Sequence, residues 1–250
     1  MFDLHMHTVF SDGKNTAEEM VQEAIRRGLD TVGLSDHSQG DPCGMTWEST
    51  EEYKKEIARL KEKYRGQIRV LCGLERDFMS EDFSGYDYVI GSLHWLTMAD
   101  GHHVSIDWTA EKLREGAEKY FDGDMYALAE VYYAAEARVA EVTKCDIIGH
   151  FDLITKFIEQ DPTFDLQHPR YVAAWQGACD VLLKTGKIFE VNTGAMSRGY
   201  RTEPYPHAEI RRYILDRGGK LILSSDAHAK ENICSGFDAY GEGCLAECPF

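Results

Sequence analysis

Short apolar runs alternate with amphipathic helical stretches along the whole chain. Each run is about 4 to 6 residues long, the usual length of a β-strand, and a polar residue follows it at once. The predicted strands lie near residues 2–5, 31–35, 68–73, 88–93, 146–149, 187–191 and 220–224. Because a helical stretch usually separates one run from the next, the pattern predicts a parallel sheet built from βα units.

The predicted helices have recognisable boundaries. Thr16 and Glu19 have the spacing of a capping box, in which the two residues bond each other's backbone N–H groups, and Gly28 can end the helix that follows. Ser49 and Glu52 repeat this start pattern for a second helix. A longer helical region at 109–145, with a break at 120–124, predicts two helices inserted in one connection.

Potential metal ligands follow the predicted strands. They are His5, His7, Asp12, His37, Glu75, His94, His150, Asp226 and His228. Two histidines that are two residues apart on a strand point to the same side, and a turn can return Asp12 to that side. Asp12 could equally be a turn former or a helix cap. The set exceeds what one ion can use, so it predicts two or three divalent ions that share a bridging carboxylate.

The spread of these ligands along the chain favours a closed barrel. The carboxyl ends of successive parallel strands converge on one face of a barrel, so residues distant in sequence become neighbours. In an open sheet the end strands would lie too far apart to share one cluster. An eighth strand is not evident, so we expect a distorted α/β barrel of seven strands in one domain, residues 1–250.

Composition and charge narrow the range of partners. The 27 basic and 43 acidic side chains give a formal net charge of −16, which disfavours nucleic acid and anionic membranes as partners. No stretch approaches ~18 consecutive apolar residues, and the N-terminus lacks the features of a classical signal peptide. The seven cysteines are scattered without a CxxC pair, so we expect reduced thiols and a cytoplasmic protein.

Four histidines lie outside the strand-end pattern, in polar or proline-flanked segments. They are His102, His103, His168 and His207. We expect these four side chains at the surface. The tyrosine stripe of Tyr126, Tyr132 and Tyr133 is expected to pack within a helical region, and the residues after Ala239 are expected to form a short surface tail.

The strand-end motifs resemble those of the PHP (polymerase and histidinol phosphatase) superfamily. DLHMHT, SDHS, GLE, GSLH, GHFD and SDAH occur in this order over essentially the whole chain. The segment FEVNTGAMSRGY at 189–200, followed by EPYP at 203–206, is similar to the monofunctional histidinol-phosphate phosphatases. The resemblance implies a distorted (β/α)7 barrel and a trinuclear centre of zinc, manganese or iron.

The resemblance also implies how the ions share their ligands. The first ion is expected at His5, His7, Glu75 and Asp226. The second ion is expected at His94 and His150, and Glu75 is expected to bridge the first and second ions. The third is expected at Asp12, His37 and His228. On this assignment Glu75, Asp226 and His228 belong to the catalytic centre.

Such a centre implies a metal-dependent phosphomonoesterase. Coordination lowers the pKa of water toward ~7, so a hydroxide bridging two ions could attack phosphorus in line while the third ion neutralises developing charge. Arg198 is expected to be catalytic and to bind the phosphate, because its fork can donate two parallel hydrogen bonds to an oxyanion. Alternatively, Arg198 is an exposed loop residue paired with a carboxylate. Lys156 is a second candidate for substrate binding.

Three functions are compatible with these observations. The first is hydrolysis of L-histidinol phosphate to L-histidinol and phosphate, in histidine biosynthesis. The second is a PHP-type phosphoesterase for another small phosphate or nucleotide ester, although the chain has no basic stripe to follow a nucleic-acid backbone. The third is a noncatalytic metal-binding module, which the complete ligand set weighs against.

Overall fold

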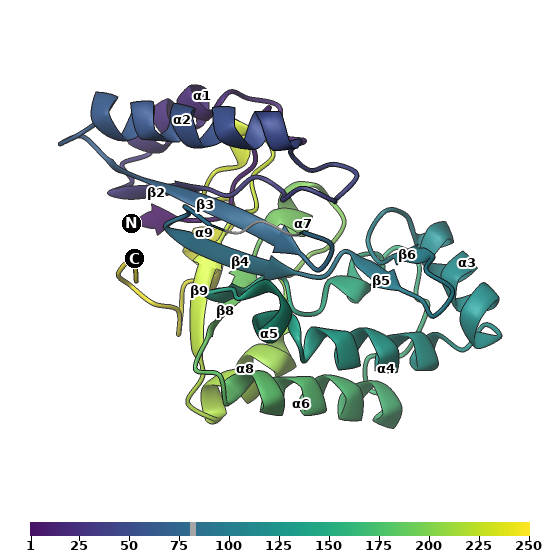
Figure 1. Ribbon diagram of the computed structural model, residues 1–250. Coiled ribbons are helices and arrows are strands. Elements are labelled where there is room, and N and C mark those ends of the chain that lie inside the picture. The colour runs from purple at the N-terminus through teal and green to yellow at the C-terminus, as the bar shows by residue number, and fades with distance from the viewer. Residues whose placement is uncertain (81–83) are drawn as a thin grey trace.

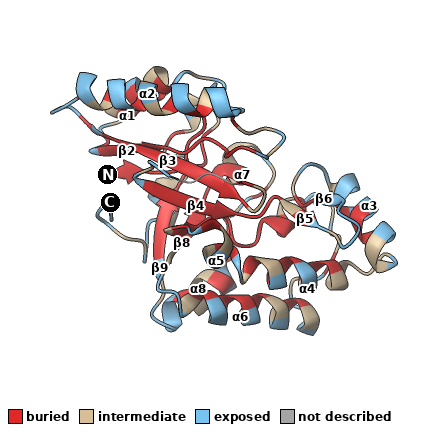
Figure 2. Ribbon diagram, in the orientation of Figure 1, coloured by how far each residue is buried: buried red, intermediate tan, exposed pale blue. Residues whose placement is uncertain are grey.

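Every apolar run that predicts a strand forms one. The structure is a computed structural model that describes residues 1–80 and 84–250. Seven of its strands form one parallel sheet in the order β1-β2-β3-β4-β7-β8-β9 (Figure 1). They are β1 (Phe2–Asp3), β2 (Thr31–Leu34), β3 (Arg69–Asp77), β4 (Tyr88–Ser92), β7 (Ile147–Ile148), β8 (Ile188–Asn192) and β9 (Lys220–Ser224). Figure 2 shows that these strands are buried, whereas the surrounding helices expose their outer faces.

The sheet closes into a barrel between its first and last strands. Met6, just after β1, forms a parallel bridge with Ala227, just after β9. The His7 N–H donates to the Ala227 carbonyl at 3.0 Å, and the Ala227 N–H donates to the His5 carbonyl at 3.2 Å. This closure confirms the predicted distorted (β/α)7 barrel.

Strand β3 is longer than its apolar run predicts. Instead of ending at Gly73, it continues to Asp77 and stays paired with β4 along the extension. The prediction that Glu75 follows the strand is therefore wrong, because Glu75 lies within it. The charged residues of the extension are tolerated in a buried strand because they find partners. The Arg76 guanidinium, for example, donates to the Thr143 carbonyl at 2.7 Å.

Helices surround the barrel. The α-helices are α1 (Ala17–Arg26), α2 (Trp47–Lys63), α3 (Ala110–Phe121), α4 (Met125–Glu136), α5 (Val139–Thr143), α6 (Pro169–Leu183), α7 (Gly194–Ser197), α8 (Ala208–Asp216) and α9 (Phe237–Tyr240), and η1 (Leu153–Thr155) and η2 (Lys230–Asn232) are 3₁₀ helices. In Figure 1, α1 and α2 cover one side of the barrel, and α4, α6 and α8 lie on the other. Across residues 1–80 and 84–250, no helix combines the length and apolar character needed to span a membrane.

The starts of the first two helices differ in how well the sequence predicts them. The Thr16 hydroxyl accepts the Glu19 N–H, and the Glu19 carboxylate accepts the Thr16 N–H, which confirms the capping box. Helix α2 begins three residues earlier than predicted, with Thr46 as its cap. The predicted start at Ser49 and Glu52 is wrong because Ser49 takes the second role in a box, accepting the Thr46 N–H at 2.8 Å.

The connection between β4 and β7 holds more structure than predicted. It contains an antiparallel hairpin of β5 (Trp95–Thr97) and β6 (His103–Ser105) and three helices, α3 to α5, instead of two. The predicted break between the first two helices is confirmed, since Asp122 has a left-handed φ of 51° and Asp124 caps α4. The prediction of only two helices is wrong because α5 is too short to produce a helical period. Figure 1 shows β5, β6 and α3 to one side of the barrel.

Apolar side chains fill the inside of the barrel. This cluster comprises Phe2, Leu4, Leu71, Tyr88, Ile90, Ile147 and Ile222. The Tyr88 hydroxyl donates to the Leu4 carbonyl, and its ring lies against the backbone of β3. A Cβ on Gly73 would lie 2.3 Å from the Tyr88 ring, so this position of β3 admits only glycine.

The C-terminal tail covers the amino end of the barrel. Most residues after Ala239 are exposed, as predicted. The tail is nevertheless bound to the barrel, because the Leu245 N–H donates to the Leu221 carbonyl at 2.8 Å and the Phe250 ring stacks on Tyr88 with centroids 5.2 Å apart. The opposite, carboxyl end of the strands is left for the predicted ligands.

Candidate metal centre

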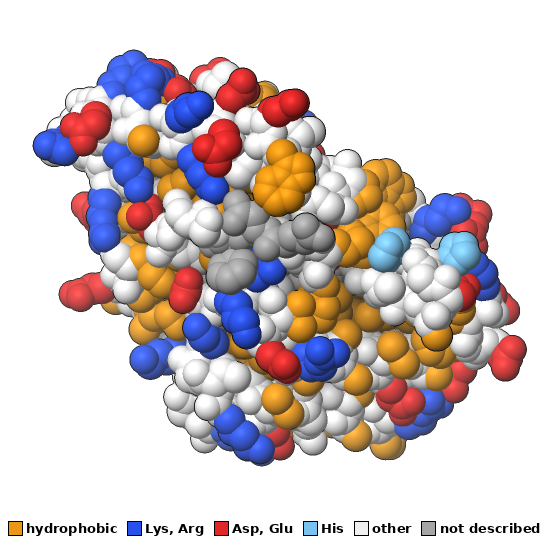
Figure 3. Space-filling view, viewed as in Figure 1, with side chains coloured by type: hydrophobic (Ala, Val, Ile, Leu, Met, Phe, Trp, Pro, Cys, Tyr) orange, Lys and Arg blue, Asp and Glu red, His pale blue; other side chains and the backbone are white. Residues whose placement is uncertain are grey.

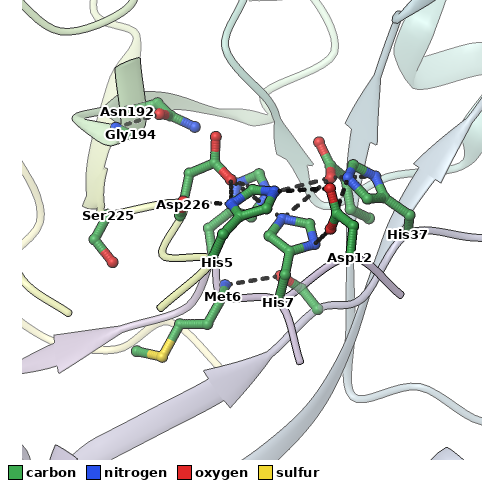
Figure 4. Close-up of polar contacts among 12 residues, drawn as sticks. His5, Met6, His7, Asp12, His37, Asn192, Gly194, Ser225 and Asp226 are labelled. Carbon is green, nitrogen blue, oxygen red and sulfur yellow. Dashed lines mark hydrogen bonds and ion pairs between the residues drawn. The ribbon is translucent and has the colours of Figure 1, made fainter. Parts of the chain in front are cut away.

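The first strand directs two histidines to the carboxyl end of the barrel. His5 and His7 are fully buried, and Met6 between them packs in the core instead, because successive side chains alternate in extended backbone. The Met6 N–H donates to the Ser35 hydroxyl at 3.2 Å, which attaches this segment to the end of β2 (Figure 4). Both imidazoles therefore face the same site.

A turn after these histidines returns Asp12 to the site. The buried Asp36 carboxylate holds the turn by accepting the N–H groups of Thr8 at 2.8 Å and Ser11 at 3.1 Å. The Asp12 carboxylate then lies 3.3 Å from His228 Nε2. Figure 4 shows the Asp12 carboxylate directed toward His7 and His37, although Asp12 itself is exposed.

The Glu75 carboxylate lies in the middle of the histidine cluster and is buried. Its Oε2 lies 2.8 Å from His37 Nδ1, 3.4 Å from His5 Nε2 and 3.5 Å from His7 Nε2. Its Oε1 lies 2.8 Å from His150 Nε2 and 3.5 Å from His94 Nε2. Each oxygen thus faces its own set of imidazoles, as expected of a carboxylate that can bridge two ions.

Asp226 joins the cluster from the end of β9. Its Oδ1 lies 3.1 Å from His7 Nε2 and 3.7 Å from His5 Nε2. The Asp226 backbone has a φ of 47°, in the left-handed region that aspartate adopts only occasionally. A Cβ on Gly194 would lie 2.8 Å from the Asp226 side chain. Glycine at that position therefore leaves the space that the carboxylate occupies.

Four groups of these side chains bring their ligand atoms close enough to hold an ion. The groups are His7, Asp12, His37 and His228; His5, His7 and Glu75; Glu75, His94 and His150; and His37, Asp41 and His94. Within each group the ligand atoms lie within 4.8 Å of one another. These groups contain every predicted ligand except Asp226, which instead contacts His5 and His7, and they add Asp41, which was not predicted.

Several buried ligand atoms have no hydrogen-bond partner in the described part of the chain. Among them are His5 Nε2, both ring nitrogens of His7 and Glu75 Oε2. Leaving a buried polar atom unpaired costs about 1–3 kcal/mol, and divalent ions between these atoms would remove that cost. Mixed imidazole and carboxylate donors suit zinc, manganese and iron, so the residues present fit a centre of these ions.

Glu190 is a buried site residue that the sequence analysis did not select. Its carboxylate accepts a hydrogen bond from His5 Nδ1 at 2.5 Å, from the His150 N–H at 2.8 Å and from the Asn192 amide at 3.0 Å. The bond to His5 leaves Nε2 of that ring facing Glu75. The sequence carries one indication that Glu190 faces the site. Glu190 and Asn192 alternate with apolar residues along β8 and therefore share its inner face.

Asp77 has a corresponding place beside His94. Its Oδ2 accepts the His94 N–H at 2.8 Å and lies 3.3 Å from His94 Nδ1. Asp77 was not predicted as a site residue, because the apolar run that predicts β3 ends at Gly73. With Nδ1 directed to this carboxylate, His94 Nε2 faces Glu75. A carboxylate behind a metal-binding histidine commonly fixes the ring in this way.

Burial and neighbouring charges give the cluster different protonation states. Burial lowers the pKa of His7 to about 3, and the charges of His228 and His37 act in the same direction. Burial also opposes the charged form of His37, but the Glu75 carboxylate outweighs it and raises the pKa of His37 to about 9. Burial disfavours ionised Glu75, yet the surrounding imidazoles hold its pKa well below its usual range. Glu75 is thus charged and His7 neutral, the forms that bind metal.

The predicted substrate-binding residues both line a pocket of about 460 Å³ over the cluster. The Arg198 guanidinium donates to Asp226 Oδ2 at 3.0 Å and lies 2.7 Å from His228 Nδ1. The Lys156 ammonium donates instead to Asp107, to its carbonyl at 2.8 Å and its Oδ2 at 3.0 Å. Arg198 therefore adjoins the candidate ligands, whereas Lys156 belongs to the wall of the pocket.

The remaining histidines lie outside the cluster. His102 and His103 are exposed, as predicted. His168 is half-buried and stacks on the Tyr126 ring with centroids 3.9 Å apart. The prediction of a surface position is wrong for His207, which is 5% exposed and packs edge-on against Trp175. It is drawn inward because its N–H donates to the buried Asp152 carboxylate at 3.0 Å. Tyr132 and Tyr133 are buried in α4, which confirms their predicted packing role.

Known proteins match the chain over most of its length. The model of the PHP domain family matches residues 3–194. A probable histidinol-phosphatase of Deinococcus radiodurans is 30% identical over 243 residues, which cover 90% of this chain and 85% of the relative. The histidinol-phosphatase of Bacillus subtilis is 26% identical over 269 residues, which cover 97% of this chain and 98% of the relative.

A solved structure has the same fold. It is the histidinol phosphate phosphatase of Lactococcus lactis complexed with zinc, L-histidinol and phosphate. The two structures superpose with a TM-score of 0.67 at 21% sequence identity, over 92% of this chain and 86% of the other. At this level of identity the comparison establishes the barrel fold.

Proposed function

Because the chain belongs to the PHP domain family, we propose that it is a metal-dependent histidinol-phosphatase, which hydrolyses L-histidinol phosphate to L-histidinol and phosphate. Relatives named for this activity match 90% and 97% of the chain. The structural observation that carries the proposal is the buried Glu75 carboxylate with imidazoles facing both of its oxygens. Paired metal ions held in this way suit the hydrolysis of phosphate esters.

We assign the ligands to two or three ions of zinc, manganese or iron. His5, His7, Glu75 and Asp226 would hold the first ion. Glu75, His94 and His150 would hold the second. Asp12, His37 and His228 would hold the third. The support is geometric, because each set combines ligands from the ends of different strands, and the first two sets are buried.

We propose that Arg198 binds the phosphate of the substrate. When bound, the ions would lower the pKa of water toward neutrality and neutralise phosphoryl charge. Arg198 uses part of its fork on Asp226 and His228, and a guanidinium carries five N–H donors, so further donors can reach a phosphate in the pocket. Asp226 would thus orient Arg198 beside the ion that it also helps to hold.

Surface charge supports a small substrate rather than a polymer. Figure 3 shows acidic and basic side chains intermixed on one face, without a continuous basic stripe. The formal net charge is −16, which would repel a nucleic-acid backbone. We further propose that residues 1–250 act as one domain in the cytoplasm, since ligands come from both ends of the chain and all seven cysteines are unpaired.

The proposed function is tested by comparing substrates on zinc- or manganese-loaded protein. We expect kcat/KM for L-histidinol phosphate to exceed that for p-nitrophenyl phosphate and for a mononucleotide by about 100-fold or more, which corresponds to ~2.7 kcal/mol of selective transition-state binding. Similar rates on all three would refute the assigned substrate but keep metal phosphoesterase chemistry. Metal-loaded protein without turnover would indicate a noncatalytic module.

A further inference from the structure

The pocket over the metal cluster contains charged side chains that metal binding does not explain. Its charged lining residues outside the proposed ligand set are Lys14, Asp41, Asp107, Lys156 and Arg198. The proposed substrate is a phosphate ester whose alcohol carries an ammonium group. A cation such as Arg198 suits its phosphate end, so recognition of the ammonium falls to one of the two carboxylates.

Asp41 is already committed to the protein. Its Oδ1 accepts the Cys43 N–H at 2.7 Å, and its Oδ2 accepts the indole N–H of Trp95 at 3.2 Å. The side chain is only 5% exposed and also lies 4.0 Å from His94 Nδ1. Both oxygens thus have partners, and little of the carboxylate is open to the pocket.

Asp107 presents a carboxylate oxygen that is still available. Its Oδ2 accepts from the Lys156 ammonium, whereas Oδ1 has no hydrogen-bond partner in the part of the chain that the structure describes. The Asp107 side chain is 24% exposed at the pocket. Asp107 lines the same pocket as the candidate metal ligands His94 and His150.

Lys156 holds Asp107 in this position. The Lys156 ammonium donates to both the carbonyl and the carboxylate of Asp107, and it lies over the Tyr200 ring, 5.0 Å from the centroid. The lysine side chain is only 13% exposed. Both of these hydrogen bonds are to Asp107 in the loop between β6 and α3, and an aromatic face covers the charge.

We propose that Asp107 is the residue that recognises the ammonium group of the substrate, with Lys156 as its positioning residue. The inference rests on the proposed function and deepens it. In L-histidinol phosphate the amino-bearing carbon is attached to the ester methylene, so the ammonium lies close to the phosphorus. Arg198 and the ions would bind one end of this short segment, and Asp107 would bind the cation at the other. An ester without the amino group would leave Asp107 Oδ1 without this partner in the occupied pocket.

The test compares Asp107→Asn with Asp87→Asn on zinc-loaded protein. Asp87 is a matched control, because its carboxylate also pairs with a lysine, Lys61 at 2.6 Å, but lies outside the pocket. Asp107→Asn should lower kcat/KM for L-histidinol phosphate by about 10- to 100-fold, the usual size of a hydrogen bond to a charged group. It should change kcat/KM for p-nitrophenyl phosphate and for desamino histidinol phosphate by less than about threefold. Asp87→Asn should leave all three rates near wild type.

The outcomes separate this inference from the proposed function. If Asp107→Asn keeps the wild-type preference for histidinol phosphate over the other two substrates, Asp107 does not recognise the ammonium. The proposed function is then unaffected. An equal loss on all three substrates also overturns it, because Asp107 would then act on the metal centre rather than on the ammonium. A wild-type enzyme that hydrolyses the desamino ester as well as histidinol phosphate refutes ammonium recognition altogether. Calorimetry gives the supporting measurement. We expect Asp107→Asn to bind L-histidinol more weakly than wild type and to bind phosphate equally well.

Discussion

The Glu190 carboxylate determines which ring nitrogen of His5 faces the cluster. It binds His5 Nδ1, so Nε2 points to Glu75. The candidate ligands other than Asp41 could be predicted from sequence, because each has a ligand-type side chain at or near a strand end. Glu190 is harder to recognise, because its only indication is the alternation of polar and apolar residues along β8. Its importance depends on the contact with His5, which lies 185 residues earlier in the chain.

Glu190→Gln should therefore weaken metal binding while the fold is retained. Residues behind a metal-bound histidine typically contribute about 10- to 100-fold to affinity, and we expect a loss of that size in a zinc competition titration with a chromophoric chelator. Glu136→Gln is the control, since Glu136 is equally buried but belongs to α4 rather than to a barrel strand. Unchanged zinc affinity in Glu190→Gln would show that His5 is oriented by other contacts.

Glu136 gives a prediction about pH. Burial raises the pKa of this carboxyl well above its ordinary 4.5, and Oε1 has no hydrogen-bond partner among the described residues. The folded protein therefore binds this proton more tightly than the unfolded chain, so the free energy of unfolding falls as the pH rises above 4.5. Glu136→Gln removes this loss and should be more stable than wild type at pH 8, by a margin that shrinks toward pH 5.

Urea denaturation at several pH values measures this margin. Glu141→Gln, at an exposed glutamate of α5, removes the same charge from the surface and serves as the control. If both variants change stability equally at each pH, the effect comes from net charge rather than from the buried carboxyl.

At the scale of elements, β3 joins the barrel interior to the site. Gly73 accommodates Tyr88, and Glu75, two residues further along the same strand, enters the cluster. The strand positions were predictable because apolar runs are unambiguous over several residues. The hairpin of β5 and β6 was not, because strands of three residues are too short to show a period. The start of α2 was misplaced because serine at 49 suits either role in a capping box.

Gly73→Ala should destabilise the barrel and disturb the site. The new Cβ would lie 2.3 Å from the Tyr88 ring and 2.8 Å from the Leu34 carbonyl, and overpacking of this kind costs about 1–3 kcal/mol. Chemical denaturation should show that loss together with lower zinc affinity. Gly177→Ala in α6 is the control, because a Cβ there meets nothing within 4 Å. It should be neutral or stabilise by up to about 1 kcal/mol. Equal stability of the two variants would mean that Tyr88 can move aside.

At the scale of the whole molecule, the ligand set connects most of the barrel. The candidate ligands come from segments at or after β1, β2, β3, β4, β7 and β9. Closure of the barrel was predictable from this spread, because only a ring of strands brings such distant residues together. The role of the C-terminal tail was not, since its contacts with Leu221 and Tyr88 leave no pattern in the sequence.

Removal of metal should consequently lower the stability of the entire fold. Zinc at a free concentration about 1,000-fold above its Kd would stabilise the folded state by about 4 kcal/mol per site. Chelation should therefore lower Tm by roughly 8–16 °C for a domain of this size. Re-addition of zinc should restore it in calorimetry. A Tm that stays constant while the metal content falls to zero would show that the protein alone holds the buried carboxylates and imidazoles in place.

Barrel closure between β1 and β9 also has a consequence for protein synthesis. His5 and His7 leave the ribosome long before Asp226 and His228, which follow about 220 residues later. Until then the free edge of β1 is open to incorrect pairing. An ion captured early would lack the carboxylate of Asp226. Full occupancy of the centre would therefore require that the last strand has closed the barrel against β1.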